Sequence, residues 1–521
     1  MKRELLPCLL FASSVVCAQG LDPQSILNPA PDSWPTYNGD YSGRRFSALK
    51  QINTDNVRTL GLAWAFQTSL AGSQGLKSTP LLVDGTVYFT EPDDVWAVDA
   101  RSGRQNWHYH YQANEGLHIG QRGVGMYKGR LYFETPDAHL LCLDARSGEV
   151  QWNLELADVK LGYWATMAPL IIRNHVIVGV SGDFNDLHGF IDSFDAETGK
   201  LQWRWDALPK RGEPGSETWP ENSDAIEHGG GMTWITGTYD PGLNLLYWGT
   251  ANPNPVLSGA TRPGANLYTC TIVALNPDTG KLQWHFQASP HDVHDWDAVQ
   301  TPVVVDAEFQ GEQRKLLLQA SRNGYFFVLD RTNGKALLST PFEEINWTKG
   351  VDRNGQPIGK TDKYPNPSGT LVAPDAIGAT NWMSPSFNPQ TGLLYVDSHR
   401  SYSIYYDLSE GKPEGFAGRD LSVFSESYLT AIDYRTGKVR WRHDLGPGWN
   451  WAGVLSTAGG LVFTADNHGN MMAVDANDGR TLWHAYGGGA VQNPPITYAL
   501  DGRQYVLIGS QNVLYAWALP Q

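Results

Sequence analysis

Cysteine is scarce in this sequence, with four residues among 521. Cys8 and Cys17 lie in the apolar N-terminal stretch, which leaves Cys142 and Cys270 in the body of the chain, both within strand-like patterns. Two such residues support no disulfide framework, and we expect them to be buried thiols. The sequence also has no Cys-x-x-Cys-His motif, which excludes a covalently attached c-type haem.

Positive charge and long apolar runs are lacking as well. The net charge is −15, from 39 Lys and Arg against 54 Asp and Glu. Nucleic acid is therefore excluded as a partner, because phosphate binding requires clustered basic residues. After the N-terminal stretch no run of about 18 apolar residues occurs, so no transmembrane segment is predicted.

The N-terminus has the pattern of a secretory signal. Lys2 and Arg3 precede an apolar core over 5–16, which a cleavage site after Ala18 follows. We predict a signal peptide over residues 1–18 and a mature protein that is periplasmic or secreted.

Several common catalytic motifs are also missing. The sequence has no Gly-x-Ser-x-Gly elbow, no His-Glu-x-x-His helix and no phosphate-binding glycine loop before a helix. The enzyme classes that depend on these motifs are therefore disfavoured.

Tryptophan and glycine, by contrast, are abundant, with 20 and 55 residues. Many of them fall in a phrase that occurs seven times, each copy an alternating apolar strand, a turn closed by glycine and a second strand. The copies lie at 95–107, 140–152, 191–203, 272–284, 326–338, 429–441 and 471–483. Recurrence of one strand–turn–strand unit is typical of repeat architectures.

The chemistry of the turn is the same in each copy. In the first, Asp99 opens the turn and can accept hydrogen bonds from the backbone ahead of it, and Gly103 is expected to take a positive φ. Trp107 ends the second strand and is expected to wedge between neighbouring units. Leu338 replaces the tryptophan in one degenerate copy.

These patterns predict an all-β fold, an eight-bladed β-propeller of four-stranded antiparallel blades docked by tryptophan, with seven blades as the alternative. Residues 19–521 would form one domain, with insertions near 204–248 and 339–428, where the spacing between copies is longest. Pairing of the C-terminal strand at 513–519 with a strand within 56–66 would close the ring and protect its edges.

Three phrases outside the repeat carry a family resemblance. They are WPTYNGDYSGRRFSALKQINTDNV at 34–57, YDPGLNLLYWGTANPNP at 239–255 and GATNWMSPSFNPQTGLLYV at 378–396. Together with the repeat they resemble the quinoprotein methanol and ethanol dehydrogenases, which use pyrroloquinoline quinone (PQQ), over nearly the whole mature chain. The resemblance implies PQQ in a central funnel over a Ca²⁺ or lanthanide ion, an alcohol substrate and a separate soluble cytochrome c as electron acceptor.

The segment SPHDVHDWDAV at 289–299 is the most informative for chemistry. By resemblance, Asp295 is the catalytic base, Asp297 is the extra carboxylate of the lanthanide-using branch, and Asn252 is a metal-ligating amide. The resemblance therefore assigns the metal to Asn252, Asp295 and Asp297. From the residues alone, two carboxylates at i and i+2 suit a hard cation, and a polar turn that satisfies its own backbone is the alternative. A turn Asn before Pro253 is the alternative for Asn252.

Six more residues match positions that contact the cofactor in the family. They are Arg122, Thr166, Trp234, Arg322, Asn381 and Trp451. The resemblance implies that Arg322 hydrogen-bonds the quinone oxygens, that Thr166 contacts a PQQ carboxylate and that Trp234 forms the floor under the ring. Packing within the propeller is the alternative for both tryptophans.

Four departures from the family pattern fall on five positions. Gly116 and Leu117 replace a pair of adjacent cysteines, Lys77 and Phe184 each replace a glutamate, and Met232 replaces a threonine. Phe184 stands where the family has a principal metal ligand, so this change weakens metal binding. Lys77 either repels a metal or pairs with a carboxylate of PQQ.

Three functions follow from these observations. The first is a PQQ-dependent alcohol dehydrogenase, which the matched residues support. The second is a degenerate propeller that has lost PQQ and acts as a ligand- or protein-binding module, which the four departures support. The third is an assembly scaffold, which the retained polar residues oppose.

Overall fold

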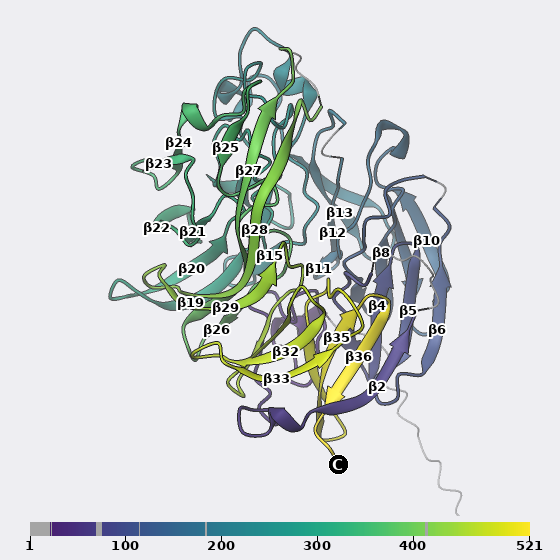
Figure 1. Ribbon diagram of the computed structural model, residues 1–521. Helices are drawn as coiled ribbons and strands as arrows, with labels where there is room; N and C mark the ends of the chain where they lie inside the picture. The colour runs from purple at the N-terminus through teal and green to yellow at the C-terminus, as the bar shows by residue number, and fades with distance from the viewer. Residues whose placement is uncertain (1–20, 22, 69–74, 114, 183–184, 412–414) are drawn as a thin grey trace, which may run out of the picture.

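The computed structural model of the chain is almost entirely β (Figure 1). It describes residues 21, 23–68, 75–113, 115–182, 185–411 and 415–521. The predicted signal peptide and Phe184 lie outside the described residues. The helical elements of the described part are α1 (Pro23–Leu27), η1 (Val57–Thr59), η2 (Val159–Leu161), η3 (Ser216–Thr218), η4 (Ala225–His228) and η5 (Thr361–Lys363). None of these helices has the length and apolar character needed to cross a membrane.

The strands pair mostly with their neighbours in sequence and run antiparallel to them. Six sheets have four strands, two have five and one has two, in the part of the chain described. The first four sheets along the chain comprise β3 (Leu81–Val83), β4 (Thr86–Glu91), β5 (Asp94–Asp99) and β6 (Gln105–His110); β7 (Gly125–Tyr127), β8 (Arg130–Glu134), β9 (His139–Asp144) and β10 (Val150–Glu155); β11 (Leu170–Ile172), β12 (His175–Gly179), β13 (Phe190–Asp195) and β14 (Leu201–Asp206); and β15 (Thr238–Asp240), β16 (Leu245–Gly249), β17 (Thr271–Leu275) and β18 (Leu282–Gln287).

The second half of the chain continues the pattern and adds strands from elsewhere. Its sheets comprise β19 (Val303–Phe309), β20 (Glu312–Ala320), β21 (Tyr325–Asp330) and β22 (Lys335–Pro341); the pair β23 (Thr348–Val351) and β24 (Pro357–Gly359); β25 (Thr370–Val372), β26 (Ser386–Asn388), β27 (Leu393–Asp407), β28 (Gly418–Asp433) and β29 (Val439–Pro447); β30 (Leu455–Thr457), β31 (Leu461–Ala465), β32 (Asn470–Asp475) and β33 (Thr481–Tyr486), joined by β1 (Phe46–Ser47); and β34 (Ile496–Leu500), β35 (Arg503–Ser510) and β36 (Val513–Ala518), joined by β2 (Gly61–Gln67). β1 runs parallel to β30.

The two regions predicted as insertions contain both irregular structure and strands. Residues 204–248 include η3 and η4, and residues 339–428 include the β23–β24 pair. Both regions also supply strands to the sheets. The second one contributes most of the long β27–β28 hairpin, which stands out in green in Figure 1.

The hydrophobic core lies between consecutive sheets. On β5, Val95 and Ala97 pack with residues of β7–β9, whereas Trp96 and Val98 pack with residues of β31–β36. This division follows from the strand period of two, which sends alternate side chains to opposite faces of the sheet. The cluster that contains Trp96 thus joins the sheet of β3–β6 to the last two sheets of the chain.

A strand near the N-terminus, β2, pairs directly with the last strand, β36. β2 runs antiparallel to β36, from Gly61 opposite Ala518 to Gln67 opposite Val513. Figure 1 shows the purple β2 beside the yellow β36. The predicted closure of the ring by the N- and C-terminal strands is therefore confirmed.

An aspartate or asparagine caps each repeat turn. The glycine that closes the turn lies against a side chain from a neighbouring sheet. Asp99 Oδ1 accepts hydrogen bonds from the backbone N–H groups of Arg101 (3.1 Å) and Ser102 (3.0 Å). Gly103 has φ +71°, and a Cβ there would lie 2.7 Å from Trp64 Cε3. Tryptophan covers the turn glycine in the same way at Trp107 with Gly148, Trp152 with Gly199, Trp203 with Gly280, Trp284 with Gly334 and Trp441 with Gly479. In the degenerate copy, Leu338 and Thr340 cover Gly437. The predicted wedging is confirmed.

The segment that precedes β1 and the buried thiols complete the scaffold. Arg45 is fully buried and donates to the carbonyl oxygens of Tyr37 (2.6 Å) and Pro495 (2.7 Å), which ties the segment to the last sheet. Cys142 and Cys270 are free and buried, as predicted. Burial raises the pKa of the Cys142 thiol to about 12 and that of Cys270 well above its ordinary value.

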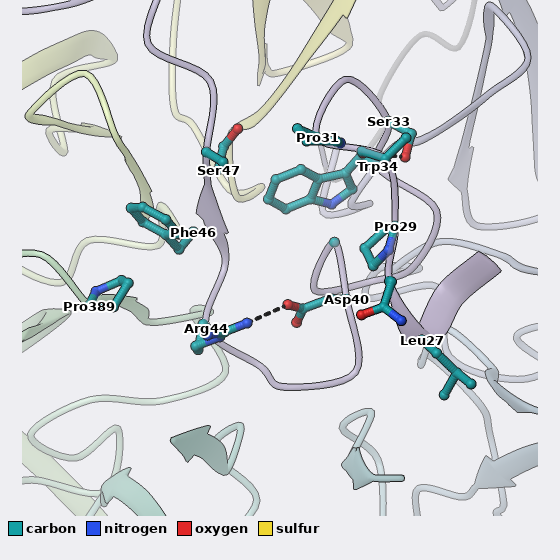
Figure 2. A pocket seen from close by; sticks show the side chains of 14 residues that line it. Leu27, Pro29, Pro31, Ser33, Trp34, Asp40, Arg44, Phe46, Ser47 and Pro389 are labelled. Carbon is teal, nitrogen blue, oxygen red and sulfur yellow. Dashed lines mark hydrogen bonds and ion pairs between the residues drawn. The ribbon is translucent and has the colours of Figure 1, made fainter. Parts of the chain in front are cut away.

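A cavity of about 370 Å³ lies beside this segment, lined mainly by residues 27–48 together with Pro389 (Figure 2). Trp34 forms one wall of it, and the ion pair between Arg44 Nη2 and Asp40 Oδ2 (3.1 Å) lies across from the indole. None of the site residues predicted from the sequence lines this cavity.

Candidate functional site

The predicted site residues lie on connections between strands rather than on the strands themselves. Arg122 precedes β7, Thr166 precedes β11, Trp234 precedes β15, Asn252 follows β16, Asp295 and Asp297 lie between β18 and β19, Arg322 lies between β20 and β21, Asn381 lies between β25 and β26, and Trp451 lies between β29 and β30. Connections held by a rigid scaffold are where proteins usually place binding and catalytic side chains.

Arg322 joins the two aspartates that the sequence singled out. Its Nη2 lies 2.9 Å from Asp295 Oδ2, and its Nη1 lies 3.0 Å from Asp297 Oδ2. Its Nε donates to the carbonyl oxygen of Ala376 at 2.9 Å, which fixes the plane of the guanidinium. The planar fork of arginine suits such paired contacts with carboxylates. We call Arg322, Asp295, Asp297 and Asn252 the acidic end of the site.

The two carboxylates differ in exposure. The Asp297 side chain is 3% exposed and that of Asp295 is 17% exposed. Burial raises the pKa of Asp297, and the guanidinium of Arg322 opposes this rise. Burial by itself would lower the pKa of Arg322, but Asp295 and Asp297 together hold that pKa above its ordinary value.

Asn252 lies directly against Asp297. Its backbone N–H donates to Asp297 Oδ1 at 2.8 Å, and its own Oδ1 is buried without a hydrogen-bond partner among the described residues. Gly230 makes this position possible, because a Cβ there would lie 2.5 Å from the carbonyl oxygen of Asn252. Asp295 has φ +66°, a conformation that a non-glycine residue adopts at a cost and that is common at functional sites.

The acidic end offers oxygen atoms to a cation. The described residues contain no group of three or more His, Cys, Asp and Glu side chains able to hold a metal ion. Here the third oxygen comes from an amide, that of Asn252, beside the carboxylates of Asp295 and Asp297. Such a donor set fits a hard cation. In this conformation Arg322 would compete with that cation for the carboxylate oxygens.

A second group of contacts surrounds Arg122. Its Nη1 donates to Thr166 Oγ1 at 2.5 Å, and its Cζ lies 5.0 Å from the ring centroid of Trp234 and 5.3 Å from that of Trp382. Arg122 Nε is buried without a partner in the described structure. Burial lowers the pKa of Arg122 to about 10.

Trp382 is a site residue that sequence reasoning did not single out. Its ring stacks on that of Trp451, with centroids 6.1 Å apart and planes 10° apart, and Trp451 in turn meets the edge of His399. Trp382 directly follows Asn381, which donates from Nδ2 to the carbonyl oxygen of Ile377 at 2.7 Å. Its place beside Asn381 in the phrase GATNWM was the signal that could have identified it.

Lys77 lies in the same group as Arg122. Its Nζ donates to the carbonyl oxygen of Ile119 and lies 6.0 Å from the ring centroid of Trp382. Burial, and then the charge of Arg122, lower the pKa of Lys77 to about 8. We call Lys77 and Arg122 the cationic end of the site.

The structure describes the surroundings of two other residues that depart from the family pattern, Met232 and Gly116. Met232 is fully buried in an apolar cluster with Val180, Phe190 and Val299, against which Trp234 and Trp382 also pack. Gly116 has φ +91°, and a Cβ there would lie 2.1 Å from the carbonyl oxygen of Pro136, so this backbone leaves no room for a cysteine.

The site thus has its carboxylates at one end and the cations Lys77 and Arg122 at the other. The acidic end and the cationic end are linked by Trp234, whose indole faces Arg122 and whose Nε1 donates to Asp297 Oδ2. Flat indole faces beside two cations fit an aromatic anion, and the carboxylate and amide oxygens of the acidic end fit a cation.

Comparison with known proteins gives one consistent result. Residues 34–368 and 425–506 match the family described as PQQ, glucose/ethanol/alcohol dehydrogenase, beta-propeller domain. The chain is 36% identical to the quinohemoprotein alcohol dehydrogenase of Comamonas testosteroni, over 92% of this chain and 72% of that protein. It is 32% identical to the 1-butanol dehydrogenase (cytochrome c) of Thauera butanivorans, over 96% of this chain and 76% of that protein.

A solved structure agrees with the sequence comparisons. The quinohemoprotein alcohol dehydrogenase ADHIIG of Pseudomonas putida superposes with a TM-score of 0.90 at 32% identity, covering 96% of this chain and 82% of that one.

Proposed function

The chain belongs to the PQQ family of glucose, ethanol and alcohol dehydrogenase β-propellers, and on this premise we propose that it oxidises an alcohol with PQQ and a Ca²⁺ or lanthanide ion. The observation that carries the proposal is the acidic end, where Arg322 holds Asp295 and Asp297 beside the unpartnered Oδ1 of Asn252. This arrangement provides both a base and oxygen ligands in one place.

The described residues fit the two absent groups. Arg122, with its buried unpartnered Nε, and Thr166 would hold a carboxylate of PQQ, and Trp234 would lie under its ring. Arg322, Asn381 and Trp451 would complete the contacts, and Asn252, Asp295 and Asp297 would hold the metal. When bound, PQQ would take up the hydride of the alcohol while the metal polarised a quinone carbonyl.

The residues of this chain divide the remaining work between them. Asp295 is the more exposed of the two carboxylates, at 17% against 3% for Asp297, and we assign to it the removal of the hydroxyl proton of the alcohol. Arg322 holds the Asp295 carboxylate in a fixed orientation through Oδ2. Asp297 is surrounded by donors from Asn252, Trp234 and Arg322, which suits a ligand or an anchor better than a base.

We also propose a number of blades for the propeller. We assign eight blades to the eight sheets of four or five strands, because core clusters lie between consecutive sheets and one cluster joins the last sheets to β3–β6. We also propose export by the N-terminal signal to the periplasm or cell exterior, and electron transfer to a separate soluble cytochrome c. The similarity to the 1-butanol dehydrogenase (cytochrome c) of Thauera butanivorans supports such an acceptor.

A second candidate function is a PQQ-less propeller that binds another ligand or a protein. The observation that favours it is that Arg322 already pairs with both carboxylates of the acidic end. Under this alternative the polar residues would serve folding, and no alcohol would be oxidised.

One experiment separates the two functions. The purified protein is mixed with PQQ plus Ca²⁺, and separately with PQQ plus La³⁺, and cofactor binding is measured by calorimetry and alcohol-dependent dye reduction by absorbance. Binding with dye reduction under either condition supports the dehydrogenase, with PQQ plus a chelator as the control. Absence of binding under both conditions would overturn it in favour of the second candidate.

A further inference from the structure

The cationic end contains two positive side chains beside one indole. Arg122 Cζ and Lys77 Nζ lie 5.3 Å and 6.0 Å from the ring centroid of Trp382. Arg122 is 5% exposed, and Lys77 is half-buried. In the part of the chain that the structure describes, neither cation forms a direct ion pair with a carboxylate, and their donors reach Thr166 and the carbonyl oxygen of Ile119. The buried carboxylate of Glu134 interacts with Arg122 and partly opposes the lowering of its pKa by burial, whereas no carboxylate of the described residues acts on Lys77 in this way.

Such an arrangement is unfavourable without a ligand. Two like charges withdrawn from water repel each other and lose hydration, and a nearby anion offsets both costs. The pKa values reflect this: burial first, and then Arg122, lower that of Lys77 to about 8, and burial lowers that of Arg122 to about 10.

Lys77 is held in this position by its neighbours. A Cβ on Gly120 would lie 2.4 Å from Lys77 Cδ, so the lysine stem lies against the bare backbone of Gly120. The carbonyl oxygen of the preceding residue, Ile119, accepts a hydrogen bond from Lys77 Nζ. The ammonium is therefore placed by specific contacts beside Trp382.

Lys77 acts on the cationic end and not on the acidic end. Arg122 is the charged side chain that shifts the pKa of Lys77 among the described residues. Asp295 and Asp297 instead pair with Arg322. Of the two consequences considered for this lysine, repulsion of a metal and recognition of a carboxylate, the geometry points to the second.

We propose that Lys77 and Arg122 form a receptor for two carboxylates carried by one aromatic ligand, and that Lys77 sets the preference of this chain for a polycarboxylate. The inference rests on the proposed function in taking PQQ, an aromatic tricarboxylate, as the natural ligand. The indoles of Trp234 and Trp382 provide the flat surfaces for the ring, and the two cations bind its carboxylates through charge-assisted hydrogen bonds.

The test measures binding in the absence of alcohol and of metal. Calorimetry follows the binding of PQQ and of benzene-1,2,4-tricarboxylate to the wild type and to the Lys77→Gln, Lys77→Arg and Lys335→Gln variants. Lys335 is an exposed lysine of β22 and controls for the loss of one positive charge. We expect Lys77→Gln to weaken both ligands about tenfold or more, because a hydrogen bond to a charged group contributes roughly 1.5–3 kcal/mol. Lys77→Arg should retain binding, and Lys335→Gln should leave it unchanged.

Proton uptake on ligand binding is a second measurement. It is expected if the Lys77 ammonium contacts the ligand, and it is not expected if Lys77 has a purely structural role. Near pH 8 the free wild type carries Lys77 partly deprotonated, so binding of an anion should take up a fraction of a proton, seen as different heats in buffers of different ionisation enthalpy. Lys77→Gln should show no such uptake. Gly120→Ala, which displaces the lysine stem but keeps its charge, should weaken both ligands in the same direction.

The outcomes separate this inference from the proposed function. Equal affinities for wild type and Lys77→Gln, with no proton uptake in either, would overturn the receptor. Loss of affinity in Lys77→Gln without alcohol oxidation by the loaded wild type would support the receptor and overturn the dehydrogenase.

Discussion

The indole Nε1 of Trp234 donates a hydrogen bond to Asp297 Oδ2 over 3.0 Å. The same ring faces the guanidinium of Arg122, 5.0 Å from its centroid. One rigid side chain therefore contacts both the acidic and the cationic end of the site and holds them at a fixed separation. The predictions below test these two ends and the scaffold that carries them.

Asp295→Asn should abolish alcohol oxidation while leaving cofactor binding in place. The amide keeps the size of the side chain but cannot accept the hydroxyl proton, and a positioned general base contributes roughly 10²–10⁴-fold to a rate. We expect kcat for dye reduction to fall by about that factor, with PQQ affinity by calorimetry within about threefold of wild type. Dye reduction at the wild-type rate would show that Asp295 is not the base.

Arg322→Met should destabilise the metal-free protein, because it removes the guanidinium that pairs with the buried carboxylate of Asp297 and with Asp295. Removal of one partner from a buried ion pair typically costs roughly 3–5 kcal/mol. Denaturant titration in the presence of a chelator measures this cost. The double variant Arg322→Met with Asp297→Asn should recover part of this stability. Equal stability of wild type and Arg322→Met would show that the pairing of Arg322 with the two aspartates does not stabilise the fold.

Added La³⁺ should also recover stability in Arg322→Met, because the ion replaces the lost positive charge between the carboxylates. Thermal unfolding with and without La³⁺ measures the recovery. A melting temperature that La³⁺ leaves unchanged in this variant would show that the acidic end does not bind the ion.

Asp292→Asn should remove a pH dependence of stability. Burial raises the pKa of Asp292 from 3.8 to about 6 in the folded chain. Ionisation of this group therefore costs stability in the fold: its favourable contribution is present below about pH 4 and is lost as the pH rises to about 6. The shift corresponds to about 3 kcal/mol, and the Asn side chain can still accept the backbone N–H groups of His294 and Trp296.

Denaturation of wild type and Asp292→Asn between pH 4 and pH 8 tests this. The variant should match the wild type near pH 4 and exceed it in stability above pH 6. The buried His294, whose pKa burial lowers to about 4, is present in both proteins and cancels in the comparison. A difference that is constant across this range would contradict the prediction.

Gly148→Ala should destabilise the protein more than Gly502→Ala. Both glycines have a positive φ, +75° and +78°, but a Cβ on Gly148 would lie 2.8 Å from Trp107 Cε3 whereas Gly502 has no atom within 4 Å. We expect about 1 kcal/mol for Gly502→Ala from the backbone alone and about 2–4 kcal/mol for Gly148→Ala, where the indole must also move. Equal losses in chemical denaturation would show that the wedge contributes nothing.

The scaffold could be predicted from sequence because its determinants are local. The turn that Asp99 opens and Gly103 closes is five residues long, and its hydrogen bonds span two and three residues. Strand alternation likewise assigns Val95 and Trp96 to opposite faces without knowledge of the partner sheet. The closure between β2 and β36 also followed from the pattern, since pairing the two terminal strands of a repeat array protects edges that could otherwise pair with another chain.

The sequence selected candidate residues for the site but did not predict the contacts among them. Resemblance selected Asp295, Asp297 and Asn252, but it gave no sign that Arg322 would bridge the two carboxylates. Trp382 was missed because its role comes only from neighbours far along the chain, Arg122 and Trp451. The catalytic and ligand roles of these residues stay predictions.

The sequence by itself determined the repeat, the capped turns and the order of the strands, since each depends on residues a few positions apart. Only the tertiary structure decided which loops meet at the candidate site and how the charged side chains on them pair. Arg122 and Thr166 are 44 residues apart, and Trp234 and Asp297 are 63 apart. Their approach depends on how whole sheets pack against one another, and burial at that meeting point sets the pKa of Lys77 and the balance between Arg322 and the two aspartates.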